Sequence, residues 1–258
     1  MAEERFKPIS VKPPSRGPLR FKLRSLVDLQ LGTIATELRP EMALLNGCVL
    51  DVGAGESPWR EWLPGSCSYQ GIDIVNAHDY GMSTNKPDIT YYDGVKIPFP
   101  DESFDAAICI EVLEHAASPD TLISEISRIL KIGAPLLMSV PWSARRHHIP
   151  YDFHRFTRER LEMLLRAHGF DQIVVRERGN DIGVIANKLT ILTWQLLCPN
   201  RRVDGFWTIP LAIPIGMMAT AILCAAHVSM YLKRGSKEDP LGYFVKAIRR
   251  NEVSLHHL

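Results

Sequence analysis

Four acidic residues stand at or just after the ends of short apolar segments in the first half of the chain: Asp51, Asp73, Asp93 and Glu111. The segments have the composition of buried parallel strands and cover residues 48–52, 68–74, 88–92 and 104–110. The carboxyl ends of parallel strands meet at one edge of an open sheet, where such sheets bind ligands. We therefore expect the four acids to converge on one binding site, although each could instead cap a local helix or turn.

A glycine turn follows the first of these segments. Gly53 and Gly55 come directly after Asp51, and glycines there let backbone N–H groups approach a polar ligand at a helix N-terminus. Asp73, about 20 residues further on, is placed to accept hydrogen bonds from ribose hydroxyls. The third glycine of a dinucleotide-binding turn is replaced by Ser57, which argues against that class of ligand.

Basic and aromatic side chains crowd the segment 145–157, which follows a predicted fifth strand at residues 135–140. Clustered imidazoles and guanidiniums suit a pocket for an anionic or hydroxylated acceptor. His148 and His154 are candidates to remove a hydroxyl proton, with Asp152 as an orienting partner. The segment could instead serve loop packing. Because the spacing of His148, Asp152 and His154 fits no common ligand pattern, we expect no metal site.

Four motifs in sequence order resemble the class I S-adenosylmethionine-dependent methyltransferases, in particular their small-molecule, type 11-like members: residues 50–55, 71–74, 97–105 and 111–115. The resemblance covers about residues 49–170. It implies S-adenosyl-L-methionine as cofactor, with the turn 51–55 on its methionine part, Asp73 on its ribose and Asp93 beside its adenine. The cofactor-binding residues expected on this basis are Asp51, Gly53, Ala54, Gly55, Asp73, Ile74, Asp93 and Glu111. The pair Glu114 and His115 invites a catalytic role, but more often orders the loop.

Helices alternate with these strands. Apolar residues recur at helical spacing over residues 119–131 and 157–168, and further strands are expected at residues 171–176 and 241–248. Alternating strands and helices predict an α/β fold with a doubly wound, mostly parallel sheet of Rossmann-like type. We expect one domain over residues 25–258, with an apolar helical insert at residues 184–232 before the last strand.

The insert contains a stretch, residues 206–232, without Asp, Glu, Lys or Arg. Its length would suffice to cross a bilayer, but a last strand at residues 241–248 must return to the side of the sheet. An even number of crossings is then required, and residues 184–198 are too short to cross and contain Lys188. A re-entrant or interface-lying helical pair satisfies both constraints, with a dimer interface or a lid as alternatives.

Composition and charge limit the kinds of partner that the chain can have. The net charge is +1, so no global field favours nucleic acid, yet residues 1–24 hold seven basic residues and four prolines. That segment predicts a flexible basic arm, which either contacts an anionic membrane surface or is a solvated tail. Five scattered cysteines without a CxxC pair and a first segment unlike a secretory signal indicate the cytoplasmic face of a membrane.

We therefore expect methyl transfer from S-adenosylmethionine to an oxygen of a membrane-associated or lipid-linked small molecule, such as a glycan intermediate. Two other classes of protein stay open. One is a catalytically inactive methyltransferase fold that serves as a membrane scaffold, against which the joint presence of Asp51, Gly53, Gly55 and Asp73 argues. The other is a nucleotide-dependent oxidoreductase, disfavoured by Ser57.

Overall fold

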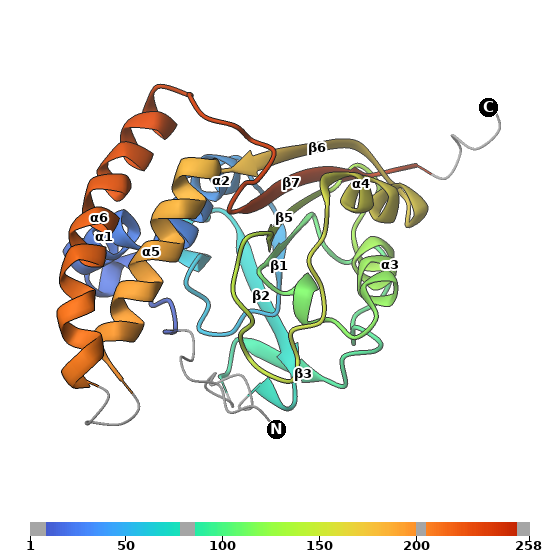
Figure 1. Cartoon of the computed structure of the whole chain (residues 1–258). Coiled ribbons are helices and arrows are strands. Elements are labelled where there is room, and N and C mark those ends of the chain that lie inside the picture. Colours follow the sequence, from blue (N-terminus) through green and yellow to red (C-terminus); the bar gives the residue numbers. More distant parts are fainter. Residues whose placement is uncertain (1–8, 78–85, 200–204, 252–258) are drawn as a thin grey trace.

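The computed structural model describes residues 9–77, 86–199 and 205–251, and its centre is a seven-stranded sheet (Figure 1). The strand order is β3-β2-β1-β4-β5-β7-β6. In chain order the strands are β1 (Cys48–Val52), β2 (Ser68–Ile74), β3 (Ile89–Tyr92), β4 (Ala106–Ile110), β5 (Pro135–Pro141), β6 (Phe170–Arg178) and β7 (Gly242–Arg249). The first five strands pair in parallel, and β7 runs antiparallel between β5 and β6. The predicted doubly wound, mostly parallel α/β fold is confirmed.

Helices cover both faces of the sheet. On one face α3 (Pro119–Ile129) and α4 (Arg158–Ala167) pack in a core with β1, β4 and β5. On the other face α2 (Leu29–Met42) packs in a second core through Leu31, Ile34 and Leu38. The side chains of Ser118 and Thr157 cap α3 and α4 by accepting a backbone N–H. The two cores fix the strand ends on which the acidic residues stand.

The predicted flexible arm is wrong for residues 14–24. A short turn of 3₁₀-helix, η1 (Pro14–Arg16), leads into α1 (Pro18–Val27). Proline is favoured at the first helical position, and Leu19, Leu23 and Leu26 recur at helical spacing behind it. Helical periodicity therefore outweighed the proline-rich and basic composition. Residues 1–8 of the arm lie outside the described residues.

The predicted insert holds two long helices, α5 (Asp181–Leu197) and α6 (Gly205–Tyr231), which lie side by side beyond the edge of the sheet together with α1 (Figure 1). Their contact uses small residues, since Ala212, Ala219 and Ala226 of α6 are buried. A Cβ on Gly216 would lie 3.1 Å from Thr193 Cγ2, so the two helices approach closely there. We call α5 and α6 the helical hairpin.

A glycine is required where β7 begins, at the base of the helical hairpin. Gly242 stands opposite Pro141 of β5 and Arg178 of β6. A Cβ on Gly242 would overlap the buried guanidinium of Arg178 and lie 2.5 Å from the carbonyl oxygen of Val140. Since the second atom belongs to the backbone of a central strand, rotating a side chain cannot relieve the overlap.

We predict that Gly242→Ala lowers the free energy of unfolding by about 1–3 kcal/mol, the usual cost of overpacking a core. Urea unfolding in detergent, followed by tryptophan fluorescence, measures the change. Gly65→Ala is the matched control, because a Cβ at Gly65 meets nothing within 4 Å. Equal unfolding midpoints for the two variants would show that this strand junction tolerates a side chain.

Candidate active site

The glycine turn after β1 forms the centre of the site. Gly53 and Gly55 have φ of 68° and 51°, in the left-handed region that favours glycine, and Ser57 shares this conformation at 52°. The backbone N–H groups of Gly53 and Ala54 both donate to the carbonyl oxygen of Ile72 in β2. The turn is therefore tied to the neighbouring strand, and the side chain of Ala54 is buried in it.

Asp73 lies beside this turn, as the sequence predicted. Its Oδ2 accepts the N–H of Gly55 at 2.9 Å, and its Oδ1 accepts the N–H of Ile74 at 2.8 Å. A carboxylate oxygen can accept two hydrogen bonds, so each keeps capacity for a ligand hydroxyl. Burial raises the pKa of Asp73, against the effect of these two backbone donors. An acceptor pair at this strand end fits the hydroxyls of a ribose.

Lys86 also contacts the turn, which the sequence did not indicate. Its Nζ donates to the carbonyl oxygen of Gly55 and to Glu56 Oε2, both at 2.9 Å. The lysine follows the residues 78–85 that the structure does not describe, and no motif of the sequence pairs it with the turn.

Asp51 is in the predicted place but buried. It is 2% exposed, and its Oδ2 accepts the hydroxyl of Tyr69 at 2.8 Å. Burial raises the pKa of Asp51 to about 7, and the nearby charge of Asp73 raises it further. Through Tyr69, which lies on β2, Asp51 links the end of β1 to the neighbouring strand.

The acids that follow β3 and β4 make contacts of their own. Asp93 is exposed, and its Oδ1 accepts the N–H groups of Val95 and Lys96, so it orders the loop after β3. Glu111 has a φ of 56°, a strained conformation for a non-glycine residue. Its Oε1 accepts from Ser139 Oγ at 2.8 Å and from Arg178 Nη2 at 2.9 Å. Glu111 therefore joins three strand ends.

Arg178 is the partner that the sequence did not reveal. Its side chain is fully buried, and its two terminal nitrogens reach Glu111, the carbonyl oxygens of Gln30 and Val140, and Thr33 Oγ1. Burial lowers the pKa of this guanidinium, whereas the charge of Glu111 raises it. In the sequence Arg178 is one of several charged residues near the end of a strand, so its burial could not be foreseen.

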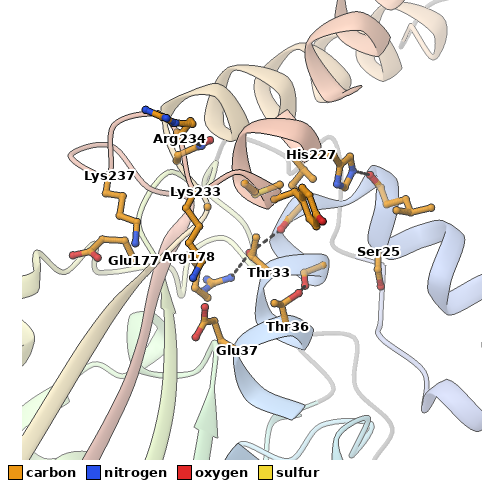
Figure 2. A pocket seen from close by; sticks show the side chains of 18 of the residues that line it. Ser25, Thr33, Thr36, Glu37, Glu177, Arg178, His227, Lys233, Arg234 and Lys237 are labelled. Carbon is orange, nitrogen blue, oxygen red and sulfur yellow. Dashed lines mark hydrogen bonds between the residues drawn. The ribbon is translucent and has the colours of Figure 1, made fainter. Parts of the chain in front are cut away.

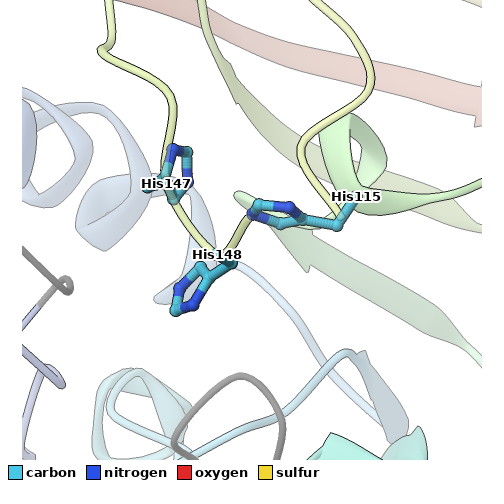
Figure 3. A group of neighbouring side chains, drawn as sticks. All are labelled: His115, His147 and His148. Atoms are coloured by element: carbon cyan, nitrogen blue, oxygen red, sulfur yellow. The ribbon is translucent and has the colours of Figure 1, made fainter. Parts of the chain in front are cut away.

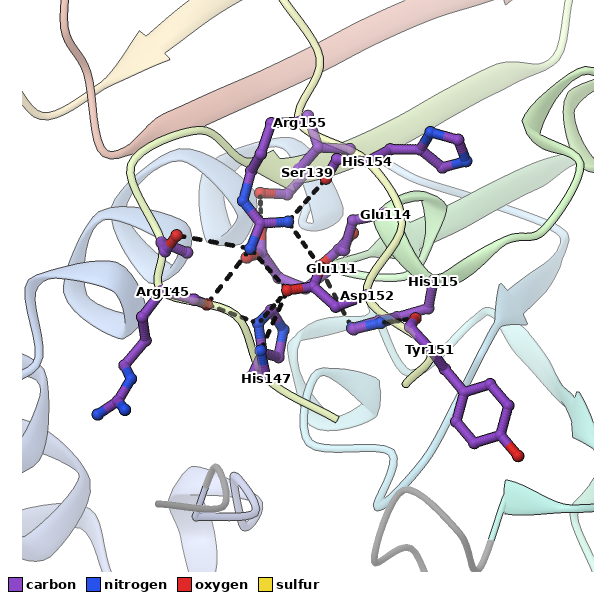
Figure 4. Close-up of polar contacts among 12 residues, drawn as sticks. Glu111, Glu114, His115, Ser139, Arg145, His147, Tyr151, Asp152, His154 and Arg155 are labelled. Atoms are coloured by element: carbon purple, nitrogen blue, oxygen red, sulfur yellow. Dashed lines mark hydrogen bonds and ion pairs between the residues drawn. The ribbon is translucent and has the colours of Figure 1, made fainter. Parts of the chain in front are cut away.

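The loop after β5 is held by an ion pair (Figure 4). Arg155 donates to both carboxylate oxygens of Asp152, at 2.6 Å and 2.8 Å, and Asp152 Oδ2 also accepts the N–H of His147. Burial alone would raise the pKa of Asp152, but these donors hold it below its usual value. Asp152 therefore orders the loop, and its carboxylate lies 3.5 Å from His147 Nδ1.

Three histidines converge above the end of β4 (Figure 3). His115 lies on the short helix η4 (Leu113–His115), and His147 and His148 come from the loop after β5. One ring nitrogen of each lies within 4.8 Å of the others. His148 is thus in this cluster and His154 lies outside it, so the catalytic role expected of both residues stays a prediction. The Nε2 of His154 donates to the carbonyl oxygen of Ala116 at 3.1 Å, and its ring lies apart from the cluster (Figure 4).

The geometry of His115 fixes its tautomer. Its Nδ1 lies 2.8 Å from the carbonyl oxygen of Tyr151, and because a carbonyl can only accept, this nitrogen carries the hydrogen. The lone pair is then on Nε2. Burial, followed by the neighbouring histidines, lowers the pKa of His115 to about 4, so the imidazole is neutral at neutral pH.

Glu114 brings a fully buried carboxylate next to this cluster. Neither of its oxygens has a hydrogen-bond partner among the described residues, and Oε1 lies 3.7 Å from His115 Nε2. Burial raises its pKa well above the usual value, and the charge of Glu111 adds to the effect. Glu114 and His115 were noted in the sequence, but their neighbours His147 and His148 come from a different strand end.

Residues 50–138 match the family model described as a methyltransferase domain. A sterol 24-C-methyltransferase of Gibberella zeae is 38% identical over 96 residues, which are 33% of this chain and 25% of that protein. An O-methyltransferase of Penicillium expansum is 27% identical over 155 residues, 52% of this chain and 55% of that protein. The chain thus spans between a quarter and about half of these relatives.

The fold also resembles that of a known methyltransferase. The solved structure of an S-adenosylmethionine-dependent methyltransferase from Archaeoglobus fulgidus aligns with a TM-score of 0.52 over 90% of this chain and 100% of that chain, at 14% identity. At this identity the likeness establishes the fold alone. Together with the matched segment, it confirms the resemblance to a family whose members use S-adenosylmethionine.

We predict that Asp51→Asn becomes more stable relative to the natural chain as the pH rises from 4 to 7. With a pKa of about 7 in the folded chain against 3.8 as its ordinary value, Asp51 keeps a proton that the unfolded chain releases in this range. Rising pH therefore destabilises the natural chain, by roughly 1.4 kcal/mol per pH unit, and leaves the asparagine variant unaffected at this site. Urea unfolding at a series of pH values tests this; parallel stability curves would contradict it.

Proposed function

We propose that this chain, whose residues 50–138 form a class I methyltransferase domain, transfers a methyl group from S-adenosylmethionine to an oxygen of a small acceptor held at a membrane surface. The observation that carries the proposal is the glycine turn of Gly53 and Gly55, hydrogen-bonded to Asp73 at the next strand end and lying within the matched segment. The turn and the acid are the parts of the site that a nucleoside-bearing methyl donor requires.

The residues present fit such a donor. Asp73 has acceptor capacity for the ribose hydroxyls, and the turn offers backbone groups at the strand edge. S-adenosylmethionine supplies a methyl group already activated as a sulfonium. The protein can therefore contribute mainly by positioning the acceptor against it, which is worth several kcal/mol of the barrier.

Oxygen is the acceptor atom that the surroundings favour. An oxygen nucleophile gains from losing its proton, and neutral imidazoles near the strand ends can accept it. His147 and His148 are the candidates at this edge, and they lie beside His115, whose pKa of about 4 makes it too weak a base for this role. The O-methyltransferase relative of Penicillium expansum agrees with this chemistry.

We predict that the chain binds S-adenosylmethionine and that Asp73→Ala weakens the binding about 10- to 100-fold, the usual worth of a hydrogen bond to a charged group. Asp73→Asn, which keeps one acceptor oxygen, should lose less. Calorimetric titration into detergent-solubilised protein measures both.

The exposed residue Asp120, far along the chain on α3, gives the control Asp120→Ala, which should bind like the natural chain. No binding by a folded natural chain, or equal binding by Asp73→Ala, would contradict the methyltransferase proposal and favour an inactive scaffold.

We further propose that the helical hairpin seats the chain on the cytoplasmic face of a membrane. Helix α6 is long and apolar enough to cross a bilayer. Yet only 17% of its most apolar 18-residue stretch is buried in the protein. Its small residues face α5, while its large ones face outward, with Trp207 76%, Met217 72% and Tyr231 86% exposed. A helix that is apolar all round and exposed in water is unfavourable, whereas a lipid environment accommodates it.

A re-entrant or interface-lying arrangement fits the topology better than a crossing. Helix α5 begins three residues after β6 ends, and β7 begins eleven residues after α6. Both helix ends therefore stay at the sheet. With 17 residues, α5 measures about 26 Å, short of the roughly 30 Å of a hydrocarbon core.

Basic residues surround the base of the helical hairpin, where a pocket of about 700 Å³ opens between α1, α2 and α6 (Figure 2). Lys22, Lys233, Arg234 and Lys237 line it. Its two acids, Glu37 and Glu177, are paired with arginines of the sheet and of α4. The surplus positive charge suits the phosphate of an anionic lipid at the headgroup level.

The loop that carries the histidines is joined to the base of the hairpin. The carbonyl oxygen of Leu241 accepts the N–H groups of Trp142 and Ser143, at 3.0 Å and 3.1 Å. Trp142 Nε1 also donates to Asp239. A membrane under the hairpin would therefore lie close to the acceptor side of the site, which supports an acceptor that resides in or on the membrane.

We predict that the chain co-sediments with vesicles of phosphatidylcholine and phosphatidylglycerol, and that Met217→Glu weakens this at least about tenfold, because it replaces an apolar contact with a charge. Met163→Glu is the matched control, since Met163 is a comparably exposed methionine (64%) on α4.

Replacing Lys233, Arg234 and Lys237 with glutamine should remove the preference for anionic over neutral vesicles. If the chain does not bind vesicles and instead forms a detergent-resistant dimer through the hairpin, the membrane proposal is contradicted and a dimer interface is supported.

A further inference from the structure

We propose that His115, His147 and His148 form a binding site for a divalent transition-metal ion of the zinc class. One ring nitrogen of each lies within 4.8 Å of the other two. The ring centroids are 4.8 to 5.3 Å apart, with planes inclined by 58° to 84°, so the rings turn edges toward one another and do not stack. The three side chains surround a common point above the end of β4 (Figure 3).

The backbone orients two of the three rings as ligands. His115 Nδ1 donates to the carbonyl oxygen of Tyr151 at 2.8 Å, and His147 Nδ1 donates to that of Arg145 at 3.1 Å. Metal-binding histidines in proteins commonly donate their other ring N–H to a carbonyl or carboxylate, which fixes the tautomer. The lone pairs of His115 and His147 are thus on Nε2, the nitrogen that a metal would bind.

The loop is held in this arrangement at an energetic cost. His148 adopts a φ of 51°, a left-handed conformation that is strained for a non-glycine residue and is often found at functional sites. The Asp152–Arg155 pair and the bond from the His147 N–H to Asp152 keep the loop in place. The side chains are therefore brought together by a rigid frame.

A buried carboxyl group beside the cluster supplies an independent observation. The carboxylate of Glu114 is fully buried, accepts no hydrogen bond from the described residues and lies 3.7 Å from His115 Nε2. A buried carboxyl group whose oxygens accept no hydrogen bond is costly unless a donor or positive charge lies nearby. An ion held by the three histidines would supply that charge.

The ligand set points to zinc or a similar ion. Imidazole suits zinc, copper, iron and nickel better than calcium or magnesium. Zinc–nitrogen bonds of about 2.0–2.1 Å in a tetrahedron place the nitrogens roughly 3.4 Å apart, so modest side-chain rotations would close the site. Three protein ligands leave a fourth position for an oxygen of the acceptor, whose proton the bound ion, in place of the imidazoles, would make easier to lose, and this goes beyond the methyl transfer proposed above.

Metal binding can be measured without a methyl donor, so its failure would not bear on the proposed function. The detergent-solubilised full chain, with His256 and His257 replaced by alanine to remove an adventitious pair, is stripped with a chelator and titrated with zinc chloride in a calorimeter. We expect one equivalent to bind. With cobalt chloride we expect the visible absorption of a four-coordinate ion.

The test variants are His148→Asn and His147→Gln. Asparagine tolerates the left-handed backbone of His148 and lacks the imidazole, so the fold should be kept. Each should weaken zinc binding at least about tenfold and abolish the cobalt absorption. His154→Ala, from the same loop but outside the cluster, should bind zinc like its parent. The proposal is overturned if the parent does not bind zinc. It is also overturned if both test variants bind zinc as tightly as the parent while thermal melting shows that they are folded.

Discussion

The buried pair of Arg178 and Glu111 is the interaction on which the arrangement of the site depends. Glu111 stands at the end of β4, Arg178 at the end of β6, and Ser139 of β5 donates to the same carboxylate oxygen. The guanidinium also holds α2 through Gln30 and Thr33. Leaving the fully buried guanidinium of Arg178 without the partly exposed Glu111 would cost about 3–5 kcal/mol, so the strand ends, the helix and the base of the helical hairpin keep one relative position.

This pair also divides the sheet edge into two working regions. On one side β1 and β2 bring the glycine turn and Asp73 together, on a parallel sheet whose ends are rigid. On the other side β5 leads into the loop with the histidines, and β6 and β7 lead to and from the hairpin. A donor site and an acceptor side thus share one edge, with Glu111 at the end of β4 between them and Arg178 reaching it from β6.

The sheet and the glycine turn could be predicted from the sequence, because apolar segments, glycines and acids at strand ends follow local rules. Asp73 was expected at a strand end near the turn, and it lies there for that reason. What could not be predicted concerns residues whose positions are decided by distant partners. Arg178 is buried only because Glu111 faces it, and His154 turned toward Ala116 while His147 and His115, from different strand ends, approached each other. Composition misled at residues 14–24, where prolines and charges suggested an arm and a helix formed.

The antiparallel placement of β7 has a consequence for how such a chain could arise. Because Arg178 at the end of β6 stands directly opposite Gly242 at the start of β7, the two strands could be joined by a turn of a few residues. In topological terms the whole helical hairpin is therefore the loop of a β-hairpin. Such a loop can lengthen, shorten or be exchanged without altering the register of any strand, so attachment to a surface and the chemistry at the strand ends are free to evolve as separate modules of one protein.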